Sequence, residues 1–224
     1  PGDYRVREYY NTPWSPRFFR KGALVAITCL TSNSAEAYRI ARGFRQAGST
    51  VVMGGPHVTF FPEEALEFCH SVVAGPAEGV WEQVVRDHEA GALRPVYRGS
   101  CPPEKVEAVD RYLLTRPPYE IKDFLEIARG CKFSCEFCNA GGFMDGIVRH
   151  RPGTVAELLR KVKTEYKEVL FLDYNLYSDP AHLEAVLEAI TPVGIGWSGS
   201  LSIDFAENER LVGLMKKSGC RAVY

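Results

Sequence analysis

Hydrophobic and polar positions in the first half of the chain predict a parallel sheet wound with helices. Three continuous apolar runs are typical of strands buried on both faces, and they span residues 23–29, 49–55 and 71–75. Segments with helical spacing follow them, with capping residues, prolines or terminal glycines, at residues 35–48, 62–69 and 76–91. This β-α-β-α-β-α order predicts an α/β fold with a partial doubly wound parallel sheet.

A second alternation of strands and helices follows a proline-rich stretch. The predicted strands span 124–130, 168–175, 194–203 and 220–224, and the helices 153–166, 179–190 and 208–219. Each of these strands ends in a polar loop, and Asp179 is the expected cap of the second helix. Half of a (β/α) barrel has this order. We therefore expect an N-terminal extension, a first domain, a linker and a partial barrel, at residues 1–22, 23–98, 99–124 and 125–224.

Composition excludes several classes of protein. Of the 224 residues 46% are hydrophobic and 25% charged, with a formal net charge of −1, so no strong field attracts nucleic acid or an anionic membrane. No apolar stretch approaches the ~20 residues needed to span a bilayer. Seven cysteines, an odd number, argue against a disulfide framework and favour a cytoplasmic protein. The start lacks methionine and both halves look incomplete, so we expect a fragment of a longer chain.

Three of the cysteines lie within eight positions, spaced C-x₃-C-x₂-C: Cys131, Cys135 and Cys138. Structural zinc sites usually combine two separated ligand pairs, and no second pair is present. A 4Fe–4S cluster usually takes four cysteines, so three leave one iron open to another ligand. The triplet follows a predicted barrel strand, at the end where barrel active sites lie. A zinc knot and a cysteine cluster without function remain alternatives.

The pattern C-x₃-C-x-aromatic-C, with Phe137 as the aromatic residue, resembles the signature of radical S-adenosylmethionine (SAM) enzymes. The resemblance implies that the three cysteines bind a 4Fe–4S cluster and that SAM chelates the open iron. It also implies reductive cleavage of SAM to a 5′-deoxyadenosyl radical, with Phe137 against the adenine. An electron donor such as ferredoxin or flavodoxin is then an expected partner, together with a small-molecule substrate.

Polar residues at the ends of two predicted barrel strands are candidates for SAM contacts. Asp173 and Asn175 resemble the segment that contacts the SAM amino group, although the common Gly-Gly-Glu form is absent. Ser200 and Ser202 are candidates toward the SAM ribose or carboxylate. The alternative for Asp173 is a structural residue that caps a turn.

Residues 23–98 are similar to the Rossmann-like cobalamin-binding domain that precedes the barrel in one class of radical SAM enzymes, class B. The resemblance assigns cobalamin contacts to the strand ends, at Thr31, Ser32, Asn33, Gly54, Gly55, His57, Gly75, Ala77, Glu78 and Gly79. The D-x-H-x-x-G motif that supplies a lower histidine ligand is absent. We interpret His57 as a structural residue or a contact to the nucleotide tail. A generic α/β domain that only packs on the barrel is the alternative.

Together the two resemblances imply a radical SAM enzyme that transfers a methyl group from cobalamin to an unactivated carbon. A cyclisation or rearrangement without methyl transfer stays open. So do a non-catalytic iron–sulfur electron-transfer protein and a zinc-stabilised binding module. The substrate and the oligomeric state do not follow from the sequence. We expect the 224 residues alone to be weakly active or inactive.

Overall fold

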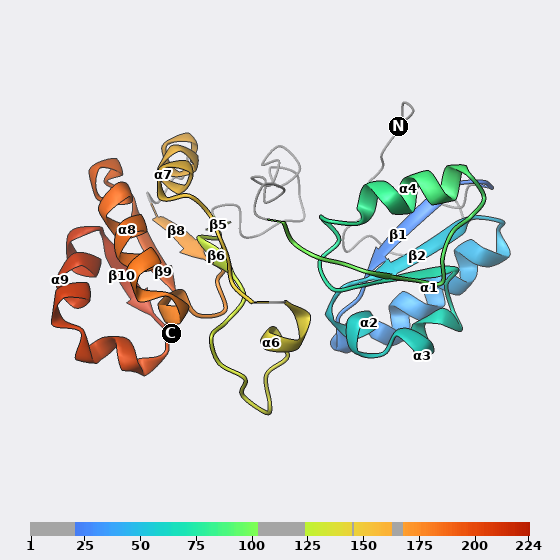
Figure 1. The fold of residues 1–224 in the computed structure, drawn as a ribbon, viewed down its shortest axis with the longest axis horizontal. Helices are drawn as coiled ribbons and strands as arrows, with labels where there is room; N and C mark the ends of the chain where they lie inside the picture. The colour runs from blue at the N-terminus through green and yellow to red at the C-terminus, as the bar shows by residue number, and fades with distance from the viewer. Residues whose placement is uncertain (1–20, 103–123, 145, 163–167) are drawn as a thin grey trace. The chain divides into compact units, whose positions relative to one another are not determined.

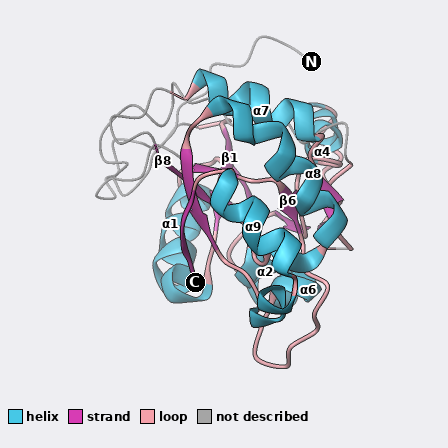
Figure 2. Cartoon of the chain, turned by 90° about the vertical axis from the view of Figure 1, so that its left-hand side faces the viewer, coloured by secondary structure: helices cyan, strands magenta, loops and turns pink. Residues whose placement is uncertain are grey.

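The computed structural model describes residues 21–102, 124–144, 146–162 and 168–224. The chain divides into two compact units, Pro1–Lys105 and Val106–Tyr224, whose elements are labelled in Figure 1 and coloured by type in Figure 2. The boundary lies within the segment assigned to the linker. Most of that linker, and nearly all of the expected N-terminal extension, lie outside the described residues.

The first unit contains a four-stranded parallel sheet. Its strands are β1 (Leu24–Thr28), β2 (Thr50–Gly54), β3 (Ser71–Ala74) and β4 (Val96–Arg98). Its helices are α1 (Ser34–Gln46), α2 (Pro56–Phe60), α3 (Pro62–Leu66) and α4 (Trp81–Glu89), with a 3₁₀ turn at Thr31–Asn33. The three strands expected from the sequence are confirmed, whereas β4 and α2 were not predicted. The described strands lie side by side in chain order, without the reversal of a doubly wound sheet.

Helices nevertheless cover both faces of this sheet. On one face α1 packs Ala37, Tyr38 and Ala41 into a cluster with alternate residues of β2. On the other face Val84 of α4 packs with Val52 and Val73, and Trp81 joins this second cluster. Because successive strand residues point to opposite faces, continuous apolar runs are what a sheet covered on both sides requires.

The second unit contains another four-stranded parallel sheet, in which helices cover one face. Its strands are β5 (Phe124–Leu125), β8 (Glu168–Phe171), β9 (Gly196–Gly199) and β10 (Cys220–Val223), paired in the order β10-β9-β8-β5. Its longer helices are α7 (Pro152–Lys161), α8 (Pro180–Ile190) and α9 (Glu209–Lys217), with 3₁₀ turns at Leu176–Ser178, Thr191–Val193 and Ile203–Glu207. The order is that of half a barrel, while the barrel itself stays a prediction. None of the described helices is long and apolar enough to cross a membrane.

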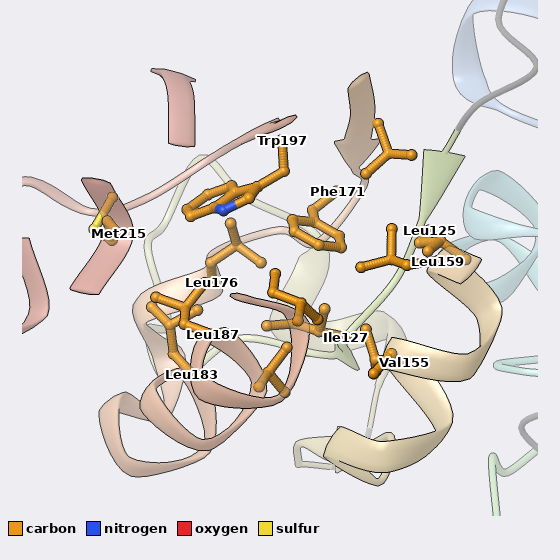
Figure 3. Close-up of a cluster of buried hydrophobic side chains, with 14 of the residues drawn as sticks. Leu125, Ile127, Val155, Leu159, Phe171, Leu176, Leu183, Leu187, Trp197 and Met215 are labelled. Atoms are coloured by element: carbon orange, nitrogen blue, oxygen red, sulfur yellow. The ribbon is translucent and has the colours of Figure 1, made fainter. Parts of the chain in front are cut away.

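One apolar cluster joins the sheet of the second unit to its helices (Figure 3). The rings of Phe171 and Trp197 lie side by side, with centroids 5.5 Å apart. The Trp197 Nε1–H donates a hydrogen bond to the Ser218 hydroxyl at 3.1 Å, so the one polar atom of this buried ring has a partner. At the start of α8 the Asp179 carboxylate accepts the His182 N–H at 3.1 Å, which confirms the predicted cap.

A hairpin carries the cysteines away from the sheet. The strand expected at 124–130 is wrong in part, because only β5 joins the parallel sheet. The chain then forms β6 (Ala128–Arg129), which pairs antiparallel with β7 (Val148–Arg149). We call residues 130–147, which include the short helix α6 (Ala140–Phe143), the cysteine loop (Figure 1). At its base a Cβ on Gly130 would lie 2.2 Å from the Gly146 carbonyl oxygen, so only glycine allows this closure.

Truncation of the second core tests this packing. Leu187 is fully buried in the cluster, so Leu187→Ala is expected to lower the free energy of unfolding by about 2–5 kcal/mol. Val212 on α9 is 41% exposed, and Val212→Ala is expected to change it by less than about 0.5 kcal/mol. Urea unfolding followed by circular dichroism measures both. Equal losses in the two variants would contradict this description of the core.

Candidate functional site

Polar side chains gather where β8 and β9 end. The carboxyl ends of parallel strands meet at one edge of the sheet, and ligands bind at that edge in α/β folds. Asp173 and Asn175 follow β8, whereas Ser200 and Ser202 follow β9. The cysteine loop begins after β6, and β6 follows β5 in the chain. These connections therefore make up the candidate site of the second unit.

The structure brings Asn175 and Ser202 together. The Asn175 Nδ2 donates to the Ser202 hydroxyl at 3.0 Å, and Asn175 Oδ1 accepts the backbone N–H groups of Ser202 and Tyr177 at 3.0 Å each. The Ser200 carbonyl accepts the Leu176 N–H at 2.9 Å. These bonds tie the connection after β8 to the connection after β9. The side chain of Asn175 is thus already used to shape the edge of the sheet.

Asp173 holds the start of the cysteine hairpin. Its side chain is buried, and its two oxygens accept the backbone N–H groups of Ile127 at 3.0 Å and Ala128 at 2.6 Å. Burial raises the pKa of this carboxyl to about 7, although the two amide bonds act in the opposite direction. Asp173 therefore has a structural role, as the sequence allowed, but it binds the neighbouring chain segment rather than its own turn. Its contact with SAM stays a prediction.

The three thiols of the cysteine loop are free. Cys131 is half-buried, whereas Cys135 and Cys138 are exposed, and Phe137 between them is 93% exposed. Nowhere in the described ranges do three His, Cys, Asp or Glu side chains form a group that could hold a metal ion. In number and kind the donors fit a cluster held by three thiolates. In this conformation the loop does not gather them at ligating positions.

Two residues that sequence reasoning missed join the cysteine loop to the end of β9. The Lys132 ammonium lies 3.0 Å from Asp204 Oδ2. The nearby Ser202 hydroxyl and then Lys132 hold the pKa of Asp204 below its ordinary value. Asp204 Oδ1 is buried and has no hydrogen-bond partner in the part of the chain that the structure describes. This oxygen has almost no exposed surface, so a donor on a ligand would reach it only if the turn moved. An isolated lysine and aspartate 72 positions apart give no pattern in the sequence.

In the first unit, His57 is buried with both ring nitrogens engaged. Its Nδ1 lies 3.2 Å from the Thr31 hydroxyl, and its Nε2 lies 3.0 Å from the Tyr38 hydroxyl. Glu64 Oε1 is 3.7 Å from the same Nε2. Burial, followed by Glu64, raises the pKa of Tyr38. The histidine links the turn after β1 to the segment after β2, which is a structural role, while its contact to a nucleotide tail stays a prediction.

The glycines at these strand ends allow the chain to pack closely on itself. Gly55 has φ +94°, and a Cβ there would lie 2.8 Å from the Cys29 carbonyl oxygen. Added Cβ atoms on Gly75 and Gly79 would lie 3.1 Å from the Gly99 oxygen and 2.2 Å from the Ser100 hydroxyl oxygen, respectively. Gly54 is less crowded, with the nearest atom at 3.5 Å. Close approach to a corrin stays a prediction for all four.

Thr59, which sequence reasoning missed, connects the segments after β2 and β3. Its hydroxyl donates to the Gly55 carbonyl at 2.9 Å and accepts the Gly75 N–H at 2.8 Å. The available signal was its position at the end of "GGPHVT". The remaining predicted cobalamin residues lie around this edge: Thr31, Ser32, Asn33 and Ala77 are exposed, and Glu78 is half-buried.

Buried thiols in the first unit differ from those of the cysteine loop. Cys29 and Cys69 are almost completely buried, and burial raises the pKa of each thiol to about 11. Such thiols are poor ligands and poor nucleophiles at neutral pH, because the thiolate is the reactive form. The two behave as small core residues.

Residues 20–85 match the family model described as the B12 binding domain. This finding agrees with the parallel α/β sheet of the first unit and supports the resemblance of residues 23–98 to a cobalamin-binding domain. It does not test the resemblance that rests on the cysteine pattern.

Named relatives extend the similarity over most of the chain. It is 29% identical over 219 residues to bacteriochlorophyllide d C-12(1)-methyltransferase of Chlorobaculum tepidum, covering 92% of this chain and 47% of the relative. The C-8(2)-methyltransferase of the same organism is 28% identical, with coverages of 89% and 48%. An uncharacterized methyltransferase of Pyrococcus horikoshii is also 28% identical, with coverages of 90% and 50%. The chain thus spans about half the length of these methyltransferases.

The raised pKa of Asp173 makes a prediction about stability. The unfolded carboxyl has a pKa near 3.8, so between pH 4 and about 7 the folded state holds a proton that the unfolded state has lost. This contribution is complete below pH 4 and is lost as the pH rises to about 7. The free energy of unfolding of the unchanged, metal-free protein minus that of Asp173→Asn is therefore expected to fall from pH 4 to about 7. Above about pH 7 this difference is expected to stay constant.

Asp179→Asn is the matched control, because the His182 N–H and Arg149 lower the pKa of Asp179. Its carboxyl is ionised in both states between pH 5 and 8, so its effect on unfolding is expected to be constant there. Urea unfolding at a series of pH values measures both variants. A constant difference for Asp173→Asn as well would show that this carboxyl does not titrate with folding.

Proposed function

We propose that this chain binds a 4Fe–4S cluster and SAM in its second unit and cobalamin in its first, as part of a class B radical SAM methyltransferase. One observation carries the proposal: three free thiols lie on a loop whose base is bonded to the polar strand ends of a parallel sheet. The B12 binding domain supports cobalamin, and the names of the relatives support methyl transfer.

The bound groups would supply the difficult chemistry, which is a 5′-deoxyadenosyl radical from SAM at the cluster and a methyl group from cobalamin. The protein holds and orients them. Cys131, Cys135 and Cys138 supply the thiolates, and the exposed ring of Phe137 is free to lie against adenine. An enzyme of this kind also needs an electron donor, for which a ferredoxin or flavodoxin is our proposal.

For SAM, we propose the edge formed by Asn175, Ser200, Ser202 and Asp204. The SAM ammonium and ribose hydroxyls are donors, so they need acceptors. Both Asp173 oxygens already hold backbone amides, whereas Asp204 Oδ1 has no partner within the described residues. Asp204 is therefore a better candidate for a donor on SAM than Asp173, which the sequence had favoured.

For cobalamin, we propose the exposed turn Thr31–Asn33 and the loop of Ala77 and Glu78 as contact residues. His57 is not proposed as a cobalt ligand, because both of its ring nitrogens have partners. A small molecule is the proposed substrate class. The seven free cysteines support a reducing, cytoplasmic setting.

Iron content tests the cluster. After anaerobic reconstitution, the protein is expected to hold iron and sulfide, and Cys135→Ala to retain less than about a tenth of the iron. Cys220→Ala, which alters a half-buried thiol on β10, is the control and is expected to bind iron normally. Dithionite and SAM are then added, and 5′-deoxyadenosine is measured. Zinc without iron would support the binding module instead. Iron and sulfide in a protein that neither binds SAM nor forms 5′-deoxyadenosine would support the electron-transfer protein.

Cobalamin binding tests the first unit through Thr59. Thr59→Val removes both hydrogen bonds of the hydroxyl, so the dissociation constant of hydroxocobalamin is expected to rise about tenfold. Thr59→Ser keeps the hydroxyl and is expected to bind as the unchanged protein does. Thr154→Val, on the exposed side of α7, controls for the substitution itself. Binding is followed by the visible absorbance of the corrin. Equal affinities for Thr59→Val and Thr59→Ser would contradict the role of the hydroxyl.

A further inference from the structure

Lys132, the residue after the first cysteine, makes contacts through both its backbone and its side chain. Its N–H donates to the Ser178 hydroxyl at 3.3 Å. Its ammonium lies 3.0 Å from Asp204 Oδ2 and 4.7 Å from the centroid of the Tyr177 ring. The same ammonium lies 4.9 Å from the centroid of the Phe133 ring. Lys132 is the first residue of the loop beyond Cys131, so these contacts act directly beside a proposed ligand.

The partners of Lys132 come from two different connections of the sheet. Tyr177 and Ser178 lie in the 3₁₀ turn after β8, and Asp204 lies in the 3₁₀ turn after β9. Asn175 and Ser202 bond these two connections to each other. The result is a continuous set of polar contacts from the proposed SAM edge to the cysteine loop. Among the described residues, no other ion pair involves residues 131–138.

The strength of the ion pair is not the reason for its importance. The side chains of Lys132 and Asp204 are 31% and 43% exposed, and ion pairs of this kind add little to global stability. Aromatic faces add a modest attraction for the ammonium. Local contacts of this size instead decide how far an exposed loop samples other positions. Their effect is expected in the loop, while the unfolding of the unit is expected to change little.

We infer that Lys132 is a positioning residue that sets where Cys131 lies relative to the ends of β8 and β9. The consequence for SAM rests on the proposed function, because the position of the loop then decides where SAM reaches the cluster. Its structural part does not depend on iron. Asp204 Oδ2 therefore contacts the loop, while Oδ1 is buried and makes no hydrogen bond within the described residues.

Hydrogen exchange of the metal-free chain tests the positioning by itself. In Lys132→Met, which keeps the length of the side chain but removes its charge, amides at 129–139 are expected to exchange about fivefold faster. Lys132→Arg keeps the charge and is expected to restore slow exchange. Arg210→Met is the control, because it breaks a surface pair with Glu184, at 3.2 Å, between α9 and α8. Unchanged exchange at 129–139 in Lys132→Met would overturn the inference.

Ser178→Ala supplies a second variant in case Lys132→Met does not fold. It removes only the hydroxyl that accepts the Lys132 N–H, and the same acceleration at 129–139 is expected. Exchange in α8 and α9 is expected to stay unchanged in both variants, because those helices belong to the core. Acceleration throughout the second unit would show a general loss of stability and would overturn a positioning role.

Electron paramagnetic resonance of the reduced, reconstituted protein tests the consequence. Addition of SAM is expected to change the cluster spectrum of the unchanged protein and of Lys132→Arg. In Lys132→Met the SAM concentration that gives half of this change is expected to rise about tenfold, with iron content retained. An unchanged midpoint would overturn the consequence for SAM. If the unchanged protein binds no iron, the proposed function fails, while hydrogen exchange still decides the positioning.

Discussion

The hydrogen bonds that two backbone amides donate to the Asp173 carboxylate are the contact on which the second unit depends. The chain leaves the parallel sheet after β5 and immediately pairs with β7 in the opposite direction, so Ile127 and Ala128 sit at a change of partner. Their N–H groups would otherwise be buried without acceptors. A carboxylate at the end of β8 supplies both acceptors at once. It thereby fixes where the cysteine loop begins relative to the sheet.

In both units the connections that follow neighbouring strands are held together, but different groups hold them. In the first unit, glycines let neighbouring backbone segments approach, and the hydroxyl of Thr59 joins two of them. In the second unit, side chains with several hydrogen-bonding atoms, such as Asn175, hold the connections together. Both arrangements leave exposed polar groups at the edge where parallel α/β sheets bind ligands. The strand ends of the unit that matches the B12 binding domain model and the cysteine loop thus have comparable places within their own units.

Much of the fold could be predicted because strong apolar runs and helix caps are local signals. The strands around Val51 and Val169 and the cap at Asp179 are examples. The strand β4 was missed because three residues are too short to show a period. The division of 124–130 was missed because it depends on the distant residues Val148 and Arg149.

The residues of the candidate site were predictable only where they form a local pattern in the sequence. Three cysteines at short spacing and glycines at strand ends form patterns, so the sequence singles them out, while their roles stay predictions. Lys132 and Asp204 are far apart in the chain, and only the fold brings them together. Asp173 was found as a polar strand end, yet its partners lie on another segment, which no local pattern reveals.

The buried and the exposed thiols differ in how readily they are oxidised. With a pKa of about 11, Cys29 and Cys69 hold very little thiolate at neutral pH, and the surrounding core keeps oxidants away. Cys135 and Cys138, by contrast, are exposed. Air is therefore expected to oxidise the thiols of the cysteine loop first and to leave those in the interior of the first unit intact. Damage of this kind would be local, so an oxidised molecule would keep its folded shape.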